Sequence, residues 1–135
     1  LNRVLHGQIT GFVTGAAALI AADGEMTIAN AGNPAPYRNG KELAVNSGVP
    51  LGLVAEVIYE ETHYTLNPND HLTFVSDGVI EATNQHRELF GFDRTQAISS
   101  QSANAIAAAA QQFGQQDDIS VLAITRAPAL KATLA

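Results

Sequence analysis

The hydrophobic and polar positions of the chain predict short strands joined by tight turns in its first half. An apolar run over residues 13–22 is followed by Asp23-Gly24 and by a second run over residues 26–29. In the same way, Asn39-Gly40 separates residues 37–38 from 43–45. Asp-Gly and Asn-Gly favour two-residue hairpin turns, because both central residues need a positive φ. Two antiparallel hairpins are therefore predicted.

A third pair of strands is predicted further along the chain. Residues 57–66 and 71–75 read as strands, and Asn67-Pro68-Asn69-Asp70 reads as the turn between them. This pair is expected to be hairpin-like. A final apolar run predicts a strand over residues 119–125.

The second half of the chain contains two predicted helices. Asp93 is expected to cap a short helix, and Ser102 a longer one over residues 103–113 that Gly114 ends. The longer helix has an apolar face and should pack on a sheet. That face comprises Ile106, Ala110 and Phe113.

These elements predict one α+β domain in which antiparallel strands form a sheet or sandwich covered by helices. A chain of 135 residues that is 46% hydrophobic can bury a single core. The domain is expected to cover residues 1–126, followed by a loose tail over residues 127–135 without a motif.

The start of the chain resembles the end of a helix, because Leu1, Val4 and Leu5 have helical apolar spacing. The first residue is Leu rather than Met. We therefore expect this chain to be a piece of a larger protein.

Composition and charge exclude several classes of function. Seven Lys and Arg against thirteen Asp and Glu give a formal charge of −6, which disfavours nucleic acid as a partner. Without cysteine there is no disulfide framework and no thiolate zinc site, and this is compatible with the cytoplasm. No apolar run is long enough to insert into a membrane, and no signal peptide is recognisable. The four histidines lack metal-ligand spacing, and the motifs of serine hydrolases and nucleotide-binding loops are absent.

Two acidic motifs lie at the ends of predicted strands. Ser76-Asp77-Gly78 follows the strand that ends at Val75, and Asp117-Asp118 precedes the final strand. Carboxylates on rigid strand ends can converge on a hard cation such as Mg²⁺ or Mn²⁺. Taken singly, the first motif is more often a simple turn and the second more often a solvated loop end than a metal site.

Six segments of the chain form a recognisable series that spans most of residues 10–125. The segments are Phe12-Val13-Thr14, residues 29–36 (Ala-Asn-Ala-Gly-Asn-Pro-Ala-Pro), residues 50–53 (Pro-Leu-Gly-Leu), residues 75–82 (Val-Ser-Asp-Gly-Val-Ile-Glu-Ala), residues 88–91 (Glu-Leu-Phe-Gly) and residues 117–122 (Asp-Asp-Ile-Ser-Val-Leu). In this order they resemble the bacterial stage II sporulation protein E (SpoIIE) branch of the metal-dependent (PPM) protein serine/threonine phosphatases.

This resemblance implies an antiparallel β-sandwich flanked by helices and a site that holds two Mn²⁺ or Mg²⁺ ions. It implies removal of phosphate from phosphoserine or phosphothreonine by metal-activated water, without a covalent intermediate. The implied substrate is a phosphorylated regulatory protein of the anti-sigma-factor-antagonist type, so the implied role is in signal transduction.

Site residues follow from the same resemblance. The metal ions would be held by residues of two segments. The first contributes Asp77 and Gly78, and the second contributes Asp117 and Asp118. The position of Asp118 varies among relatives. Three residues would lie beside the substrate at the mouth of the site. These are Glu81, Glu88 and Gly91.

The chain departs from the family most at its front. Nothing before Asp77 matches the Gly-Asp-Val-x-Gly-His-Gly segment whose Asp bridges the two metals. Asn33 and Asn69 replace a usual His and a usual Gly, at turn positions where Asn tolerates left-handed geometry. We therefore expect the N-terminal elements of the domain to be missing and this piece to be inactive. Missing strands would expose sheet edges and favour self-association.

Three functions remain open on the sequence. The first is a metal-dependent phosphatase domain seen incomplete. The second is a degenerate phosphatase fold that binds a regulatory partner without catalysis. The third, a purely structural β-rich domain, requires the six-segment resemblance to be accidental.

Overall fold

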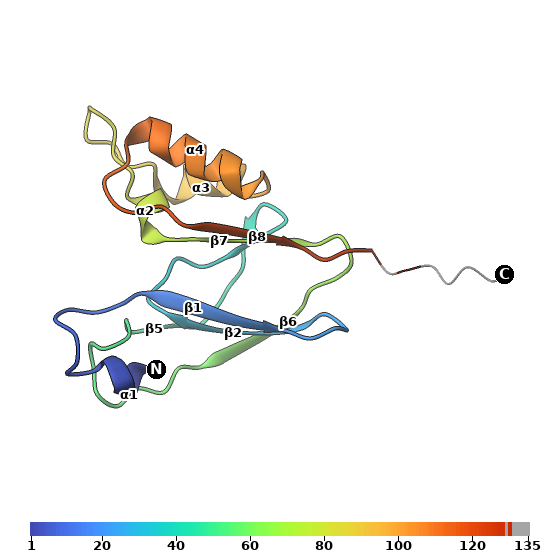
Figure 1. Cartoon of the computed structure of the whole chain (residues 1–135). Helices are drawn as coiled ribbons and strands as arrows, with labels where there is room; N and C mark the ends of the chain where they lie inside the picture. The colour runs from blue at the N-terminus through green and yellow to red at the C-terminus, as the bar shows by residue number, and fades with distance from the viewer. Residues whose placement is uncertain (129, 131–135) are drawn as a thin grey trace.

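A computed structural model of the chain describes residues 1–128 and 130, and it places two stacked β-sheets beneath a layer of helices (Figure 1). The first sheet contains β1 (Gly15–Ile20), β2 (Glu25–Ala31), β5 (Ser47–Gly48) and β6 (Glu61–Thr65). The second sheet has the order β4-β3-β7-β8, and its strands are Lys41–Glu42 (β4), Tyr37–Arg38 (β3), His71–Val75 (β7) and Val121–Thr125 (β8). The α+β sandwich predicted from the sequence is therefore confirmed.

The helices cover the outer face of the second sheet (Figure 1). They are α2 (Asp77–Ile80), α3 (Gly91–Ile98) and α4 (Ala103–Gly114). The short α1 (Asn2–Leu5) lies on the opposite side of the molecule, beyond the first sheet (Figure 1).

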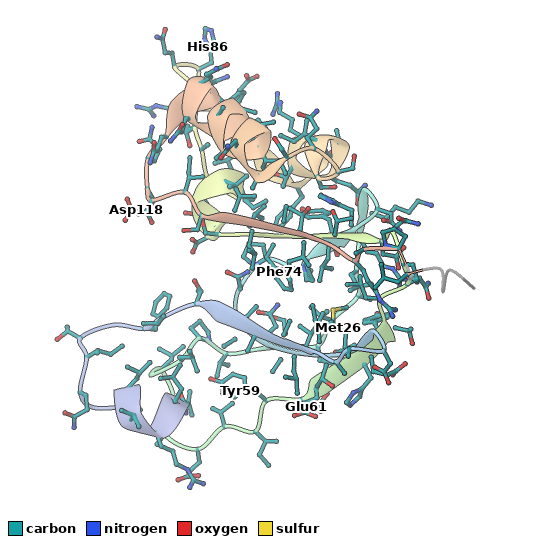
Figure 2. All side chains as sticks on the ribbon, turned by 45° about the vertical axis from the view of Figure 1, so that its right-hand side comes forward. Met26, Tyr59, Glu61, Phe74, His86 and Asp118 are labelled. Atoms are coloured by element: carbon teal, nitrogen blue, oxygen red, sulfur yellow. The ribbon has the colours of Figure 1, made fainter. Side chains whose placement is uncertain are left out.

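Alternation along β7 divides the hydrophobic core into two parts. Leu72 and Phe74 face the first sheet, where they pack with Met26 and Ile28 of β2 (Figure 2). Val75, the next residue in sequence, faces the helices. The cluster on the helix side comprises Tyr37, Val75, Val79, Ile80, Ala82, Phe90, Ile106 and Ala110.

Both predicted hairpins are confirmed, but only one of them has the predicted two-residue turn. Asn39-Gly40 joins β3 to β4, and both residues have a positive φ. Asp23-Gly24 lies in a longer turn between β1 and β2, where the Gly24 amide donates to the Ala21 carbonyl and Gly24 has a positive φ but Asp23 does not. The strand after Asn39-Gly40 was predicted at residues 43–45 and is instead Lys41–Glu42. Leu43 has already left the strand, and its amide donates to the Pro36 carbonyl.

The third predicted pair is not a hairpin. Residues 61–65 pair with β2 in the first sheet, whereas residues 71–75 pair with β3 and β8 in the second. The turn at residues 67–70 therefore carries the chain from one sheet to the other. The strands themselves are shorter than the predicted 57–66 and 119–125, since β6 begins at Glu61 and β8 at Val121.

Of the two predicted helix caps, the one at Ser102 is present and the one at Asp93 is not. Ser102 caps α4 as predicted, with its hydroxyl accepting from the Ala105 amide at 3.2 Å. Asp93 does not cap α3, because this helix already begins at Gly91 and Asp93 lies within its first turn. The helix predicted at the start of the chain is present, but Leu1 and Val4 are exposed. Buried Asn2 holds it instead, by bonds to the Val54 carbonyl and the Gly52 amide.

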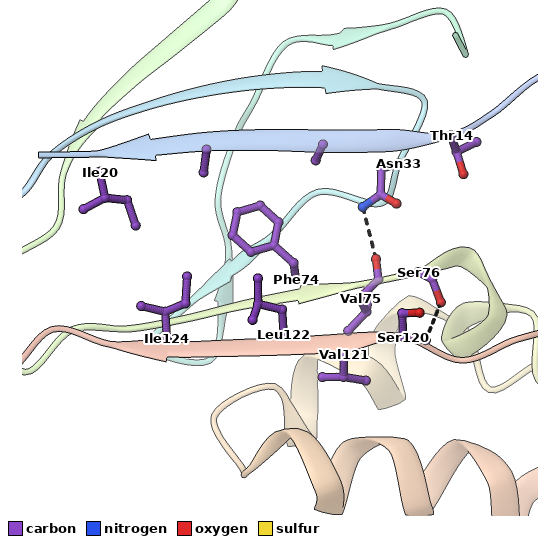
Figure 3. Close-up of a pocket in the computed structure, with 12 residues that line it drawn as sticks. Thr14, Ile20, Asn33, Phe74, Val75, Ser76, Ser120, Val121, Leu122 and Ile124 are labelled. Atoms are coloured by element: carbon purple, nitrogen blue, oxygen red, sulfur yellow. Dashed lines mark hydrogen bonds between the residues drawn. The ribbon is translucent and has the colours of Figure 1, made fainter. Parts of the chain in front are cut away.

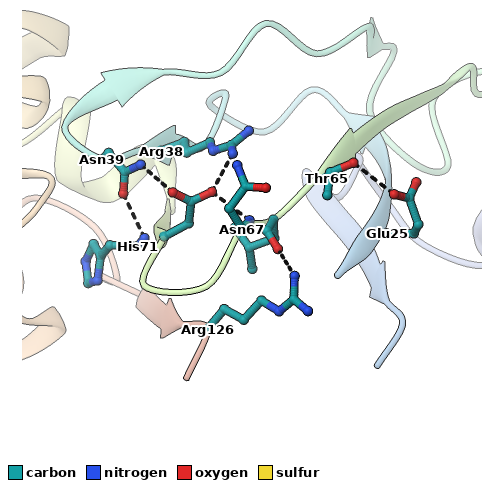
Figure 4. A network of polar contacts seen from close by, with 9 residues as sticks. Glu25, Arg38, Asn39, Thr65, Asn67, His71 and Arg126 are labelled. Carbon is teal, nitrogen blue, oxygen red and sulfur yellow. Dashed lines mark hydrogen bonds and ion pairs between the residues drawn. The ribbon is translucent and has the colours of Figure 1, made fainter. Parts of the chain in front are cut away.

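A polar cluster joins the two sheets at the crossover (Figure 4). The buried Asp70 carboxylate accepts hydrogen bonds from the Arg38 guanidinium, from Asn39 Nδ2 at 2.7 Å and from the Asn67 amide at 2.8 Å. The hydrogen bond from Asn39 is the main reason that the pKa of Asp70 is lowered. Beside it, the Arg126 guanidinium donates to the Leu66 carbonyl. This network stabilises the start of β7 on the second sheet.

Burial also acts on the phenol of Tyr37 in β3. The side chain is 1% exposed, and its hydroxyl has no partner among the described residues. Desolvation, helped by the nearby charge of Glu42, raises the pKa of Tyr37 to about 12. The phenol is therefore neutral at physiological pH.

Candidate functional site

The two acidic motifs come together because β7 and β8 are antiparallel neighbours. Val75 at the end of β7 is paired with Val121 at the start of β8. The pairing continues beyond the strands, since the Ser76 amide donates to the Ser120 carbonyl at 2.9 Å and the Ser120 amide donates to Ser76 Oγ at 2.9 Å. The residues after β7 and those before β8 therefore lie side by side.

Gly78 brings the two motifs into direct contact. A Cβ built at this position would overlap the backbone oxygen of Asp118 and lie 3.0 Å from its carbonyl carbon. Only a residue without a side chain allows this approach. The structure thus brings together four residues that the sequence singled out, namely Asp77, Gly78, Asp117 and Asp118.

The three aspartates of the two motifs differ in exposure and in their local hydrogen bonds. Asp77 is half-buried and opens α2, a helical turn that the sequence prediction had treated as a simple turn. Asp117 and Asp118 are exposed, and the Asp118 amide donates to Asp117 Oδ1 at 2.7 Å. The Asp117 carbonyl accepts from Gln115 Nε2 at 3.1 Å. Figure 2 places Asp118 at the end of the second sheet, beside α2.

These carboxylates match a hard divalent cation in chemistry but not in number. Aspartate oxygens are preferred ligands of Mg²⁺ and Mn²⁺. However, the described part of the chain contains no group of three or more His, Cys, Asp or Glu side chains arranged to hold a metal. The described residues therefore contain no complete set of side-chain ligands for a divalent cation.

Asn33 is a structural neighbour of the site whose contact the sequence did not reveal. Its side-chain nitrogen donates to the Val75 carbonyl at 3.1 Å, two residues before Asp77 (Figure 3). The left-handed geometry expected at Asn33 is absent, and Gly32 has the positive φ of 75° instead. At Asn69 the same expectation is confirmed, with a φ of 69°. Asn33 thus links the loop after β2 to the end of β7.

The three residues expected near the substrate lie in different surroundings. Glu81 is exposed at the end of α2, close in sequence to Asp77. The Glu88 carboxylate accepts from Asn84 Nδ2 at 2.7 Å, within the loop that precedes α3. Gly91 starts α3 with a φ of 75°. Glu81 alone among them shares a cavity with Asp77.

That cavity, of about 720 Å³, lies between the loop after β2, the β4–β5 segment, α2 and the start of α3. Asp77 and Glu81 form part of its wall. A second groove of about 450 Å³ lies between the two sheets and contains none of the predicted site residues (Figure 3). Its walls are largely apolar, from β1, β7 and β8. Of the predicted site residues, Asp77 and Glu81 therefore line the first cavity, whereas Asp117 and Asp118 lie outside its wall.

The family is decided by the match of residues 1–127 to the model of stage II sporulation protein E (SpoIIE). The chain belongs to the SpoIIE family. Solved structures of PP2C-type phosphatase domains share its fold, as the sequence resemblance implied. No curated protein matches the chain.

Two of the similar structures come from different bacteria. The RsbU and RsbW domains of a Mycobacterium tuberculosis protein superpose with a TM-score of 0.67 at 24% identity, covering 96% of this chain and 41% of that one. The phosphatase domain of the cell fate determinant SpoIIE from Bacillus subtilis gives a TM-score of 0.66 at 19% identity, covering 98% and 65%. This SpoIIE-family chain thus spans less than two thirds of the length of either relative.

None of the helices in residues 1–128 and 130 is long and apolar enough to cross a membrane.

Proposed function

We propose that this chain forms part of a metal-dependent phosphatase domain that acts on phosphoserine or phosphothreonine in a partner protein. The observation that carries the proposal is the packing of Gly78 against Asp118, which holds Asp77 beside Asp117-Asp118 on two adjacent strand ends. Rigid strand ends suit a site whose ligands must keep their geometry. Mn²⁺ or Mg²⁺ bound there would supply activated water and neutralise the charge of the phosphoryl oxygens.

Within this proposal, the site residues have distinct roles. Asp77 on one side, and Asp117 with Asp118 on the other, would each contribute to a metal site that needs further ligands, Gly78 allows the two segments to approach, and Glu81 lies on the substrate side. Without a cation, an anionic phosphate would be repelled by these carboxylates. Because the described residues include no group of three possible ligands, we expect the chain alone to bind metal weakly and to turn over little or no substrate.

The partner we propose is a phosphorylated regulatory protein of the anti-sigma-factor-antagonist type. Support comes from the relatives, one of which contains RsbU and RsbW domains while the other is a cell fate determinant. Glu88 and Gly91 lie in the loop before α3 and at its first residue, on the same side of the second sheet as α2. We place them at the outer rim of the region that meets this partner.

A second candidate function is a binding module that recognises a regulatory partner without catalysis. The specific observation in its favour is the incomplete ligand set in the described part of the chain. The two functions differ in whether a longer natural form of the protein supplies the remaining ligands.

The deciding experiment measures Mn²⁺-dependent phosphate release from a phosphoserine protein substrate. It compares this chain, a form extended upstream through the natural gene, and the extended form carrying Asp77→Asn. We expect activity in the extended form only, and a loss of at least about a hundredfold on Asp77→Asn because a metal ligand is removed. An extended form without metal-dependent activity would reject the phosphatase and favour the binding module.

A further inference from the structure

The cavity beside Asp77 combines an apolar surface with negative charge. Its apolar members are Val45, Ile80, Leu89 and Phe92, and its acidic members are Glu42, Asp77 and Glu81. No Lys, Arg or His lines it among the described residues. This pattern differs from the groove between the sheets, which has no acidic residue in its wall.

Two large apolar side chains of this cavity are exposed to solvent. Leu89 is 54% exposed and Phe92 is 57% exposed, on either side of the turn that starts α3. Neighbouring apolar side chains at the mouth of a cavity, rimmed by polar residues, mark a surface that binds another molecule. The backbone that carries them is held in place, since the Arg94 guanidinium donates to the Leu89 carbonyl at 2.7 Å and lies 5.0 Å from the centroid of the Phe113 ring.

The acidic side chains on the rim are available to a ligand. The carboxylates of Glu42 and Glu81 have neither a hydrogen bond nor an ion pair within the part of the chain that the structure describes. Asn30 also lines the cavity, and its side chain is already paired with the Asn33 backbone: Nδ2 donates to the Asn33 carbonyl at 2.8 Å and Oδ1 accepts from the Asn33 amide at 2.9 Å. Unpaired carboxylates beside apolar surface favour a ligand that presents a cation next to an apolar group.

We propose that this cavity binds the segment of the substrate protein that flanks the phosphorylated residue, and that it selects an apolar side chain next to a lysine or arginine. The inference rests on the proposed function and adds the sequence context that the site prefers. The phosphate itself does not enter the cavity, because Glu42 and Glu81 would repel it. It stays at the Asp77 rim, while the apolar side chain contacts Leu89 and Phe92 and the cationic one meets the two glutamates.

Binding can be measured without catalysis, using fluorescently labelled peptides and the full chain in metal-free buffer. The first peptide is a capped heptamer with a central unphosphorylated serine, flanked on each side by leucine and then lysine. In the second peptide serine replaces each leucine, and in the third glutamate replaces each lysine. Anisotropy at rising protein concentration gives each Kd. We expect the first peptide to bind at least about fivefold more tightly than either of the others, because each lacks one of the two recognised groups.

Variants then locate the site on the protein. Phe92→Ser should raise the Kd of the first peptide about fivefold to tenfold, because apolar contact area is lost. Glu42→Gln combined with Glu81→Gln should raise it about threefold to fivefold and reduce its dependence on salt. Phe12→Ser is the matched control, since Phe12 is also 57% exposed but does not line the cavity, and it should leave the Kd unchanged.

The outcomes separate this inference from the proposed function. Equal binding of the three peptides, no binding of the first peptide, or an equal effect of Phe92→Ser and Phe12→Ser would overturn the inference. Leu89→Ser provides a second test of the same surface should Phe92→Ser fail to fold. Selective peptide binding together with an inactive extended protein would support the cavity and reject the phosphatase. Phosphatase activity of the extended protein without peptide selectivity would support the phosphatase and reject the proposed role of the cavity.

Discussion

The candidate site depends strongly on a residue that contributes no side chain. Gly78 follows Asp77 and lies against the backbone of Asp117 and Asp118, so two segments about 40 residues apart in sequence meet at a position without a Cβ. The sequence identified both acidic motifs, but it could not show that Gly78, in the first turn of α2, sets their separation. That information lies in the antiparallel pairing of β7 with β8.

Replacing Gly78 by alanine should therefore damage the site and the fold together. Its Cβ would overlap the Asp118 carbonyl, and we expect a loss of about 1 to 3 kcal/mol in the free energy of unfolding, because the backbone must shift. Urea unfolding measures this change. Gly15→Ala is the control, since its nearest neighbour would lie at 3.9 Å and its φ is not in the left-handed region. Equal effects of the two substitutions would refute the role of close approach.

Among the elements, the turns were predicted well and the assignment of strands to sheets was not. Asn39-Gly40 determines its hairpin locally, because both residues adopt the positive φ that a two-residue turn requires, and at Asp23-Gly24 the positive φ of Gly24 alone is enough to reverse the chain. Residues 67–70 resemble a turn equally well, yet the chain changes sheet there. Local turn chemistry specifies a reversal but not the partner of the next strand. The helix α2 was missed because four residues are too few to show helical periodicity.

The crossover is stabilised by Asp70, and this gives a prediction with a defined pH dependence. Asp70→Asn should lower the free energy of unfolding at pH 7 by about 1 to 3 kcal/mol, because three donors lose a charged acceptor. The pKa of Asp70 is lowered in the folded state, chiefly by the hydrogen bond from Asn39. Its stabilisation is thus present above the unfolded pKa, near about 3.9, and is lost as the pH falls through the lower folded value.

The difference between wild type and Asp70→Asn should therefore narrow as the pH is lowered from 5 to 3. Urea unfolding at several pH values follows it directly. Asp93→Asn, at an exposed position in α3, should change stability by less than about 0.5 kcal/mol throughout. A pH-independent difference for Asp70→Asn would show that the charge of this carboxylate does not stabilise the crossover.

At the scale of the whole molecule, both sheets end in an edge strand on the same side (Figure 3). β1 pairs only with β2, and β8 pairs only with β7, so each has one row of backbone groups without a strand partner among the described residues. Between them lies the groove of about 450 Å³, with small and apolar side chains such as Ala16, Ala18 and Leu122. Free edges next to apolar surface favour pairing with another chain.

We accordingly propose that the isolated chain self-associates through this open side. Light scattering coupled to size-exclusion chromatography should show a mass above that of the 14.2 kDa monomer that rises with concentration. Leu122→Lys, at a position 57% exposed on the β8 edge, should shift the population toward monomer, because a lysine on an edge opposes pairing. Leu53→Lys, at a position 50% exposed outside the groove, is the control. A concentration-independent monomer would reject the proposal.

The strand order also constrains the moment at which each half of the sandwich can form during synthesis on a ribosome. Every strand of the first sheet lies within residues 15–65, whereas the second sheet pairs β3, at residues 37–38, with β7, and its edge is completed only by β8, at residues 121–125. The first sheet can therefore assemble while its inner face, with Met26 and Ile28, still lacks its cover. Until β7 at residues 71–75 has emerged, a nascent chain lacks Leu72 and Phe74, which pack on this apolar face, and the second sheet stays incomplete until residue 125. Early chaperone contact is therefore more valuable for this topology than for one whose two sheets form from adjacent segments.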